Sequence, residues 1–207
     1  MICCVRTGKK YGPEYVTRLR DGIARHAPKG SKQPFICFTD DPIEGVECLP
    51  LPVDLPKWWA KLGLFTLGKP LIYFDLDVVV VGSLAPLLAW EGFGIIKNPW
   101  LKGFNSSVMK LRGDEGHVWD KFTPGVMSVM RGDQDWLNVA MPEAPMFPIK
   151  WFPSWKAHRC FAMPEPPPDA IAINLHGSPK PHQIKDGWLH DHWLGRASPR
   201  QQGSMTL

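Results

Sequence analysis

The sequence has no apolar run that approaches the roughly 18 residues needed for a membrane-spanning helix. Its first residues do not follow the order of a signal peptide, in which positive charge precedes an apolar segment. The five cysteines are an odd number and none form a CxxC pair, so neither a disulfide framework nor a zinc site is indicated. Runs of like charge are also missing, which argues against a nucleic-acid partner. These absences predict a cytoplasmic protein without a transmembrane segment.

What is present is typical of an ordinary folded domain. The chain has 207 residues, of which 44% are hydrophobic, and a formal net charge of +4. That length and composition support one domain with a proper core. The 22 prolines gather most densely in the stretch 142–168, which is too rich in proline for a long helix. We expect that stretch to form an irregular wall.

Short apolar runs alternate with segments of helical spacing along most of the chain. This alternation predicts an α/β fold in which helices flank a mixed, mainly parallel sheet. Pro50 and Pro52 confine the third strand to an edge. The expected strands are 2–5, 34–38, 46–53, 71–81, 93–96, 108–111 and 170–175. The expected helices are 14–26, 57–67, 83–90, 133–140 and 186–193, together with one that Asp114 caps and that carries Val118, Trp119 and Phe122 on one side.

Two carboxylates interrupt the most apolar stretch, residues 70–84. Read as one buried strand, this stretch places Asp75 and Asp77 on the same side. Two close carboxylates repel unless a positive charge lies between them, and hard oxygen ligands suit Mg²⁺ or Mn²⁺ bound to a phosphate. The pattern therefore predicts a divalent ion carrying a nucleoside diphosphate. The alternative is that both aspartates cap a loop at the strand end.

Other polar residues follow predicted strands or flank them. The loop from Arg6 to Gly12 precedes a helix, and loop N–H groups in that layout can face an anion. Asp40 follows the second strand, where open α/β sheets bind ligands, although a turn or helix cap explains it equally well. Lys61 lies on an apolar helix face and either extends its amine to solvent or contacts a phosphate.

Four stretches occur in an order that is similar to a known enzyme family. They are YFDLD at 73–77, GFNSSVMKL at 103–111, GDQDWLN at 132–138 and HGSPKPH at 176–182. Together they resemble the GT-A glycosyltransferases, most closely the group that contains glycogenin and the bacterial galactosyltransferases of lipooligosaccharide synthesis. The resemblance covers residues 5 to 193 and implies a Rossmann-like GT-A domain over residues 1–194, with a flexible tail at 195–207.

The resemblance implies a metal-dependent hexosyltransferase that moves a sugar from a nucleoside diphosphate, with UDP favoured, to a glycan, protein or lipid acceptor with retention of configuration. The resemblance also implies that Asp75, Asp77 and His176 bind Mn²⁺ or Mg²⁺ and that Asp133, Gln134 and Asp135 act in catalysis. The residues that it implies for binding the nucleotide or the donor are Thr7, Tyr11, Asp40, Lys61, Asp75, Asn105, Ser106 and Lys180. In the related enzymes the residue matching Gln134 lies near the anomeric carbon.

This chain departs from the family in its late motif. The family places a metal-binding histidine three residues before the glycine, where this chain has Asn174, while His176 directly precedes Gly177. Imidazole is the better ligand for Mn²⁺, so we expect His176 to bind the metal, with Asn174 as the alternative.

Two other functions remain open from the sequence. The DLD motif is also similar to that of haloacid dehalogenase-type phosphatases, in which the first aspartate is a nucleophile. Those chains usually begin with the motif strand, whereas here it follows two earlier strands. A nucleotide-sugar-binding protein without transfer activity is the other alternative.

Overall fold

The computed structural model describes residues 1–197 and divides them into two compact units. The first unit contains residues 1–16, 33–76 and 91–149, and the second contains residues 17–32, 77–90 and those from 150 onward. The single domain expected over residues 1–194 stays a prediction. Of the tail expected over residues 195–207, residues 198–207 lie outside the described part of the chain.

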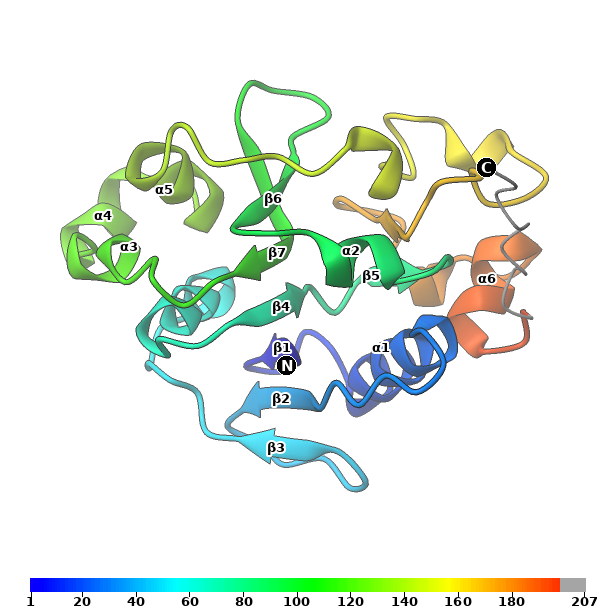
Figure 1. Ribbon diagram of the computed structural model, residues 1–207, viewed down its shortest axis with the longest axis horizontal. Helices are drawn as coiled ribbons and strands as arrows, with labels where there is room; N and C mark the ends of the chain where they lie inside the picture. Colours follow the sequence, from blue (N-terminus) through cyan, green and yellow to red (C-terminus); the bar gives the residue numbers. More distant parts are fainter. Residues whose placement is uncertain (198–207) are drawn as a thin grey trace. The chain divides into compact units, whose positions relative to one another are not determined.

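The first unit is built on a six-stranded sheet in the order β3-β2-β1-β4-β7-β6 (Figure 1). Strands β3, β2, β1 and β4 are mutually parallel, and β7 is antiparallel to both of its neighbours, β4 and β6. The mixed, mainly parallel sheet expected from the sequence is therefore confirmed. The strands are β1 (Ile2–Arg6), β2 (Phe35–Thr39), β3 (Glu47–Leu49), β4 (Leu71–Phe74), β6 (Gly94–Lys97) and β7 (Phe104–Leu111).

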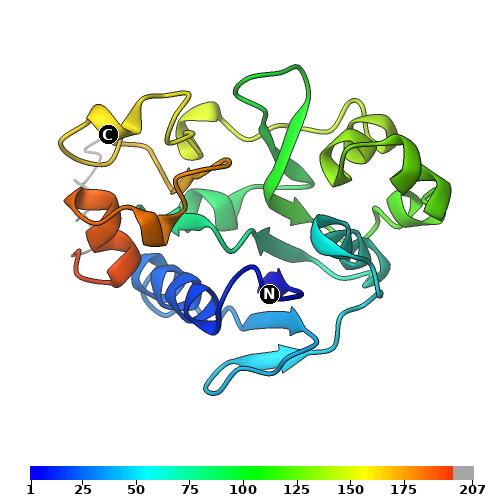
Figure 2. The ribbon, with the colours of Figure 1, turned by 180° about the vertical axis from the view of Figure 1, so that it is seen from behind.

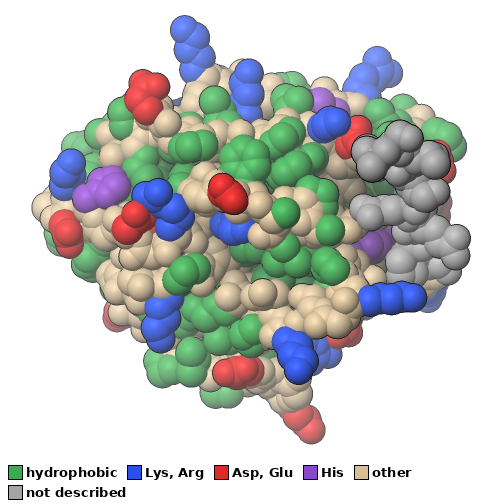
Figure 3. Space-filling model, viewed as in Figure 1, with side chains coloured by type: hydrophobic (Ala, Val, Ile, Leu, Met, Phe, Trp, Pro, Cys, Tyr) green, Lys and Arg blue, Asp and Glu red, His purple; other side chains and the backbone are tan. Residues whose placement is uncertain are grey.

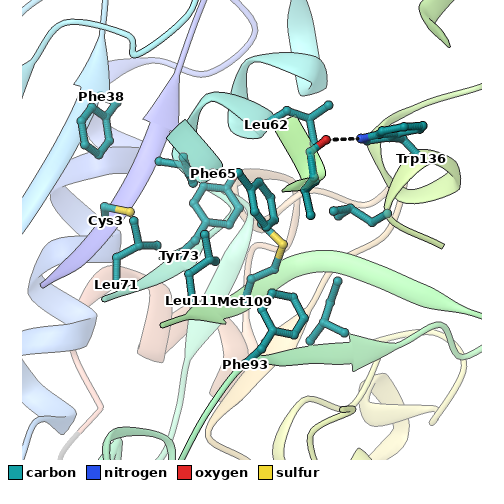
Figure 4. Close-up of a cluster of buried hydrophobic side chains, with 14 of the residues drawn as sticks. Cys3, Phe38, Leu62, Phe65, Leu71, Tyr73, Phe93, Met109, Leu111 and Trp136 are labelled. Carbon is teal, nitrogen blue, oxygen red and sulfur yellow. Dashed lines mark hydrogen bonds between the residues drawn. The ribbon is translucent and has the colours of Figure 1, made fainter. Parts of the chain in front are cut away.

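The main hydrophobic core of this unit lies between the sheet and a 3-10 helix, η1 (Lys57–Thr66) (Figure 4). Tyr73, Met109 and Leu111 extend into it from the strands, and Leu62 and Phe65 enter from η1. Burying each such side chain stabilises the fold by about 1.5–3 kcal/mol. The apolar face of residues 57–67 therefore anchors η1 to the sheet, as its spacing predicts, although the segment is a 3-10 helix.

Three short helices complete the first unit beside η1 (Figure 2). They are α3 (His117–Asp120), α4 (Pro124–Val129) and α5 (Asp133–Ala140). Both α3 and α5 contact η1. The indole N–H of Trp136 on α5 donates a hydrogen bond of 3.1 Å to the carbonyl of Val118, so this buried side chain keeps its polar group satisfied.

The second unit contains a two-stranded antiparallel sheet of β5 (Val78–Val80) and β8 (Ala172–Asn174). Gly82 follows β5, and a Cβ atom placed there would lie 2.1 Å from the carbonyl oxygen of Ala170. A glycine is therefore required for this close backbone approach. The remaining elements are α1 (Pro13–His26, in the second unit from residue 17), α2 (Ala85–Ala89), α6 (Gly187–Leu194), η2 (Ile149–Trp151), η3 (Cys160–Ala162) and η4 (Pro181–Gln183).

Two sequence interpretations are wrong in detail. The run 71–81 is two strands, β4 and β5, and Asp75, Leu76 and Asp77 lie between them outside either strand. A strand period therefore does not relate the two carboxylates. The segment 105–107, expected to lead into a strand, is part of β7, where Asn105, Ser106 and Ser107 are all buried. The polar character of these residues concealed the true length of the strand.

Charged side chains of both signs are interspersed on the face of the molecule in Figure 3, which matches the absence of charge runs in the sequence. Among the helices of residues 1–197, none combines the length and apolarity that crossing a membrane requires.

Candidate functional site

Three loops of the first unit begin where three parallel strands end. Residues 7–12 follow β1, residues 40–41 follow β2, and Asp75 follows β4. The register pairs Arg6 with Thr39, so the ends of β1 and β2 meet at the same edge of the sheet. The carboxyl edge of a parallel sheet is where open α/β folds bind ligands. The residues of the first unit that follow these strands and are predicted to bind the donor, Thr7, Tyr11, Asp40 and Asp75, therefore lie along this edge of the sheet.

At the end of β4 lies a cluster of one lysine and two aspartates, which we call the Lys61 cluster (Lys61, Tyr73, Asp75, Ser106 and Asp133). All of its members are buried except Asp75, which is partly exposed. The Lys61 ammonium is 2.7 Å from a carboxylate oxygen of Asp75 and 3.6 Å from one of Asp133. Lys61 also donates to the hydroxyl of Ser106 at 3.2 Å, and Ser106 donates in turn to Asp133. The elements η1, β4, β7 and α5 thus supply the members of one connected network.

The two carboxylates of the Lys61 cluster differ in their ionisation. Burial raises the pKa of Asp75, but the Lys61 ammonium and the 2.5 Å hydrogen bond from the Tyr73 hydroxyl outweigh it and hold that pKa below its ordinary value. Burial also raises the pKa of Asp133, and there the more distant Lys61 charge does not reverse the effect. The Lys61 ammonium therefore stabilises the charged form of the nearer Asp75 more than that of Asp133.

The three polar residues at the start of α5 have different surroundings. Asp133 is 3% exposed and belongs to the Lys61 cluster. Asp135 instead pairs with the exposed Arg131 at 2.9 Å, and hydrogen bonds from Arg131 lower its pKa. Gln134 is partly exposed and uses its backbone carbonyl to accept a bond from Asn138. Of the three predicted catalytic residues, only Asp133 joins the Lys61 cluster.

Asn105 and Ser106 occupy adjacent positions in β7, so their side chains point to opposite sides of the strand. Ser106 is in the Lys61 cluster, while the Asn105 amide oxygen accepts a 3.0 Å hydrogen bond from the backbone N–H of Ser107. The carbonyl of Ser107 accepts a 2.7 Å bond from the backbone of Asp75. Residues 105–107 therefore fix the backbone at the position where Asp75 leaves the sheet.

The loops after β1 and β2 are joined by a residue that sequence analysis did not single out. Arg6 is 7% exposed and donates to the carbonyl of Tyr11 at 3.0 Å and to the carboxylate of Asp41 at 2.9 Å. Thr7 and Tyr11 are partly buried in the first loop, and Asp40 is exposed beside Asp41. Arg6 thus holds the two loops that carry three predicted nucleotide-binding residues.

In the second unit a separate ion pair involves Asp77. Asp77 is 8% exposed, and its carboxylate accepts a hydrogen bond from the Lys180 ammonium. The same ammonium also donates to the carbonyl of Leu175 at 3.3 Å. The side chain of Gln183 accepts a 2.6 Å bond from the Lys180 backbone and holds the loop. His176 lies just after β8 and is partly buried, whereas Asn174 within β8 is 2% exposed.

Comparison with solved structures places this architecture among known folds. The chain matches the glycosyltransferase GlyE of Streptococcus pneumoniae TIGR4 with a TM-score of 0.72 and 15% identity, over 94% of this chain and 60% of GlyE. It matches the galactosyltransferase LgtC, solved with donor and acceptor sugar analogs, with a TM-score of 0.66 and 14% identity, over 94% of both chains. The bifunctional glycosyltransferase WbbM matches with a TM-score of 0.70 over 49% of its length.

The chain has the GT-A glycosyltransferase fold. The resemblance in fold therefore agrees with the one carried by the four sequence motifs. The chain spans about 60% of the length of GlyE and nearly all of LgtC. No protein-family model matches the sequence, and no curated protein is significantly similar to it.

Asp75 in the first unit and Asp77 in the second each have, by themselves, the carboxylate oxygen chemistry that Mg²⁺ and Mn²⁺ prefer. Asp75 accepts a hydrogen bond from Lys61, and Asp77 accepts one from Lys180. Across residues 1–197, no group of three or more His, Cys, Asp and Glu side chains is arranged to hold a metal. Each carboxylate therefore fits such an ion in its chemistry.

Two members of this site had weak signals in the sequence. In the sequence Tyr73 is one more residue of an apolar strand, yet its hydroxyl donates a hydrogen bond to the carboxylate of Asp75. Arg6 reads as the first polar residue after a strand. A charged residue at the end of a parallel strand, next to a glycine-containing loop, is the signal that could have identified it.

Proposed function

We propose that this chain transfers a hexose from a nucleoside diphosphate donor, with UDP favoured, to a glycan, protein or lipid acceptor. The single observation that carries the proposal is the buried Lys61 cluster at the carboxyl edge of the sheet in a GT-A fold. A buried ammonium between carboxylates is costly to desolvate, so a fold seldom keeps it for stability alone.

The donor nucleotide would occupy the loops that follow β1 and β2. Thr7 and Tyr11 offer a hydroxyl and an aromatic ring for the ribose and base, and Asp40 offers an acceptor for ribose hydroxyls. The Arg6 hydrogen bonds to Tyr11 and Asp41 support this role because they restrain both loops before the nucleotide arrives. A restrained loop loses less conformational entropy on binding.

The diphosphate carries the negative charge that develops as the sugar leaves. In our proposal Lys61 and Lys180 lie near the phosphates, and Asp75, Asp77 and His176 hold Mn²⁺ or Mg²⁺. A bound divalent ion would neutralise charge on the leaving diphosphate. Asp75 and Asp77 are each paired with a lysine in the structure, so a metal ion would have to displace these ammonium groups, which could then contact the phosphates. Asn174 remains the alternative to His176.

The sugar would lie against Ser106, Asp133 and Gln134, while Asn105, whose side chain points to the other side of β7, would act through the backbone that it holds. Burial raises the pKa of Asp133, and its carboxylate would accept a hydrogen bond from a sugar hydroxyl. Gln134, partly exposed at the same helix start, would present its amide to the anomeric carbon, and retention of configuration follows from the resemblance alone. Asp135 would contact the acceptor after release from Arg131.

The alternatives now differ in support. The likeness in fold is to glycosyltransferases, so the phosphatase reading of the DLD motif has lost its basis. The remaining alternative is a protein that binds the donor but has lost transfer activity, and the experiment must distinguish it from an active transferase.

Calorimetric titration of UDP, GDP and other nucleoside diphosphates, each with and without Mn²⁺, tests the proposal. We expect one nucleotide to bind in a metal-dependent way. The Asp75→Asn variant should lose that binding, while Asp114→Asn, which alters an exposed pair with Arg112, should keep it. Metal-independent or absent binding of every nucleotide would refute the donor site. Slow hydrolysis of the matching nucleotide sugar would then separate an enzyme from a binding protein.

A further inference from the structure

Three cysteines lie side by side across the three strands at one edge of the six-stranded sheet. The register pairs Cys4 on β1 with Cys37 on β2, and Cys37 with Cys48 on β3. All three strands are parallel, so residues in register project to the same face of the sheet. The neighbouring Cys3 points to the other face, into the main core (Figure 4).

We propose that Cys37 and Cys48 form a reversible thiol–disulfide pair at the edge of the sheet. Neighbouring strands lie about 4.8 Å apart, and a disulfide tolerates Cα separations of about 4.4–6.8 Å. Residues in direct register therefore meet the Cα requirement. Their parallel side chains must tilt toward each other to bring the Cβ atoms within the roughly 3.5–4.5 Å that a disulfide needs, which requires a small local shift of the short edge strand.

The surroundings of Cys37 favour its thiolate. Hydrogen bonds from the thiols of Cys4 and Cys48, together with the Arg6 charge, outweigh burial and lower the pKa of Cys37. Arg6 lies two residues beyond Cys4 on the same strand and therefore on the same face. Burial has the opposite effect on Cys4 and raises its pKa well above the ordinary value. Of the two buried thiols, Cys37 is thus the better nucleophile.

Access decides which neighbour of Cys37 becomes its partner. Cys4 is 0% exposed and lies on β1, between β2 and β4. Cys48 is partly exposed on the short edge strand β3, and its sulfur accepts a 3.4 Å hydrogen bond from the backbone N–H of Ile43. An oxidant from solvent therefore reaches Cys48 before it reaches either of the others.

The chemistry balances with a peroxide as oxidant. The Cys48 thiol attacks one peroxide oxygen, breaks the O–O bond and becomes a sulfenic acid, releasing one water. The Cys37 thiolate then attacks the Cys48 sulfur, and the displaced hydroxide takes up a proton and leaves as a second water. Two thiols are oxidised to one disulfide, and a dithiol reductant reverses the reaction by exchange.

Peptide mapping of the folded, full-length chain tests the pair directly. Trypsin cleaves after Lys32 and Lys57, so Cys37 and Cys48 share the peptide 33–57, while Cys3 and Cys4 lie in the peptide 1–6. After mild treatment with hydrogen peroxide, alkylation and digestion without reductant, we expect peptide 33–57 to be unalkylated and lighter by two hydrogen atoms. Prior reduction with dithiothreitol should restore the doubly alkylated form.

Matched variants sharpen the test. Cys48→Ser should leave peptide 33–57 without the internal link, whereas Cys3→Ser, on the opposite face, should leave the link intact. If Cys48→Ser fails to fold, the wild-type peptide map still decides. A doubly alkylated peptide 33–57 after oxidation, or a peptide 33–57 joined to peptide 1–6, would overturn the assignment of this pair.

Discussion

Two carboxylates at the start of α5 have opposite environments, although only one residue separates them. Asp133 is buried in the Lys61 cluster, and burial raises its pKa. Asp135 is partly exposed beside Arg131, whose hydrogen bonds lower its pKa. A helix rotates each successive residue by about 100°, so positions two apart face different surroundings. The same sequence motif thus supplies one carboxylate in a buried network and one in a solvent-exposed ion pair.

The largest loss of stability should come from removing the positive charge of Lys61 in the buried environment of Asp133. Lys61→Met leaves the carboxylates of Asp75 and Asp133 without their buried counter-charge, which costs about 3–5 kcal/mol when one partner of a buried pair is deleted. Urea denaturation should report this loss of unfolding free energy. Lys57→Met, at the exposed start of the same η1 helix, is the matched control and should unfold close to the wild-type midpoint. Equal midpoints for the two variants would show that the cluster contributes nothing to stability.

A smaller loss should follow from Gln134→Ala, and it should appear in transfer alone. If the amide acts at the anomeric carbon, removing it should slow sugar transfer by about 10²-fold, the scale of a single placed polar group in a catalytic site. Nucleotide affinity by calorimetry should stay at the wild-type value because Gln134 lies outside the Lys61 cluster. Wild-type transfer rates in this variant would remove Gln134 from the mechanism.

The pH dependence of stability should separate Asp133 from an ordinary surface acid. Its pKa is higher in the folded state than in the unfolded state, so the folded chain binds more protons in the interval between the two values. Stability from this group is therefore present below the unfolded pKa of about 4 and is lost as pH rises through the folded pKa. Asp133→Asn should remove that loss, so the variant should gain stability relative to wild type as pH rises above about 4.

Asp75 contributes in the opposite direction, because its folded pKa is lowered. Its stabilisation is present above the unfolded pKa and is lost as pH falls through the folded value. Urea midpoints of wild type and Asp133→Asn, measured across the acid range, distinguish the two contributions. A difference between the two proteins that does not change with pH would contradict the raised pKa of Asp133.

The smallest effect is expected on the exposed side. Asp135→Asn breaks a pair with Arg131, which is 81% exposed, and such surface pairs contribute little because water and salt screen them. We expect an unchanged unfolding midpoint and unchanged nucleotide affinity. Transfer kinetics at varied acceptor concentration are the remaining measurement, and a raised acceptor KM would place Asp135 at the acceptor. A large stability loss would mean that the two sides of α5 do not differ as described.

The sequence predicted the parts of the fold that depend on local pattern. The apolar runs at 2–5 and 34–38 became parallel strands, and the prolines after residue 49 kept β3 at the edge. The helical spacing of Tyr15, Leu19 and Ile23 became the buried face of α1. These predictions succeeded because burial of apolar side chains follows a period that is legible in a single segment.

Prediction was less complete where the neighbours come from several segments. The resemblance to the GT-A glycosyltransferases implied site roles for Lys61, Asp75, Ser106 and Asp133, but not that they form one hydrogen-bonded network. The run 71–81 was misread as a single strand because apolar composition does not record where the strand ends. Likewise, nothing local indicated that Cys4, Cys37 and Cys48 would align.

By itself, then, the sequence determined the α/β alternation, the buried strands and the polar residues placed at strand ends. Only the tertiary structure decided which carboxylate meets Lys61, which one stays with Arg131, and which cysteines share a face. The reason is physical. Periodicity is a property of one segment, whereas strand register, desolvation and charge pairing are sums over groups that come together only when distant segments pack.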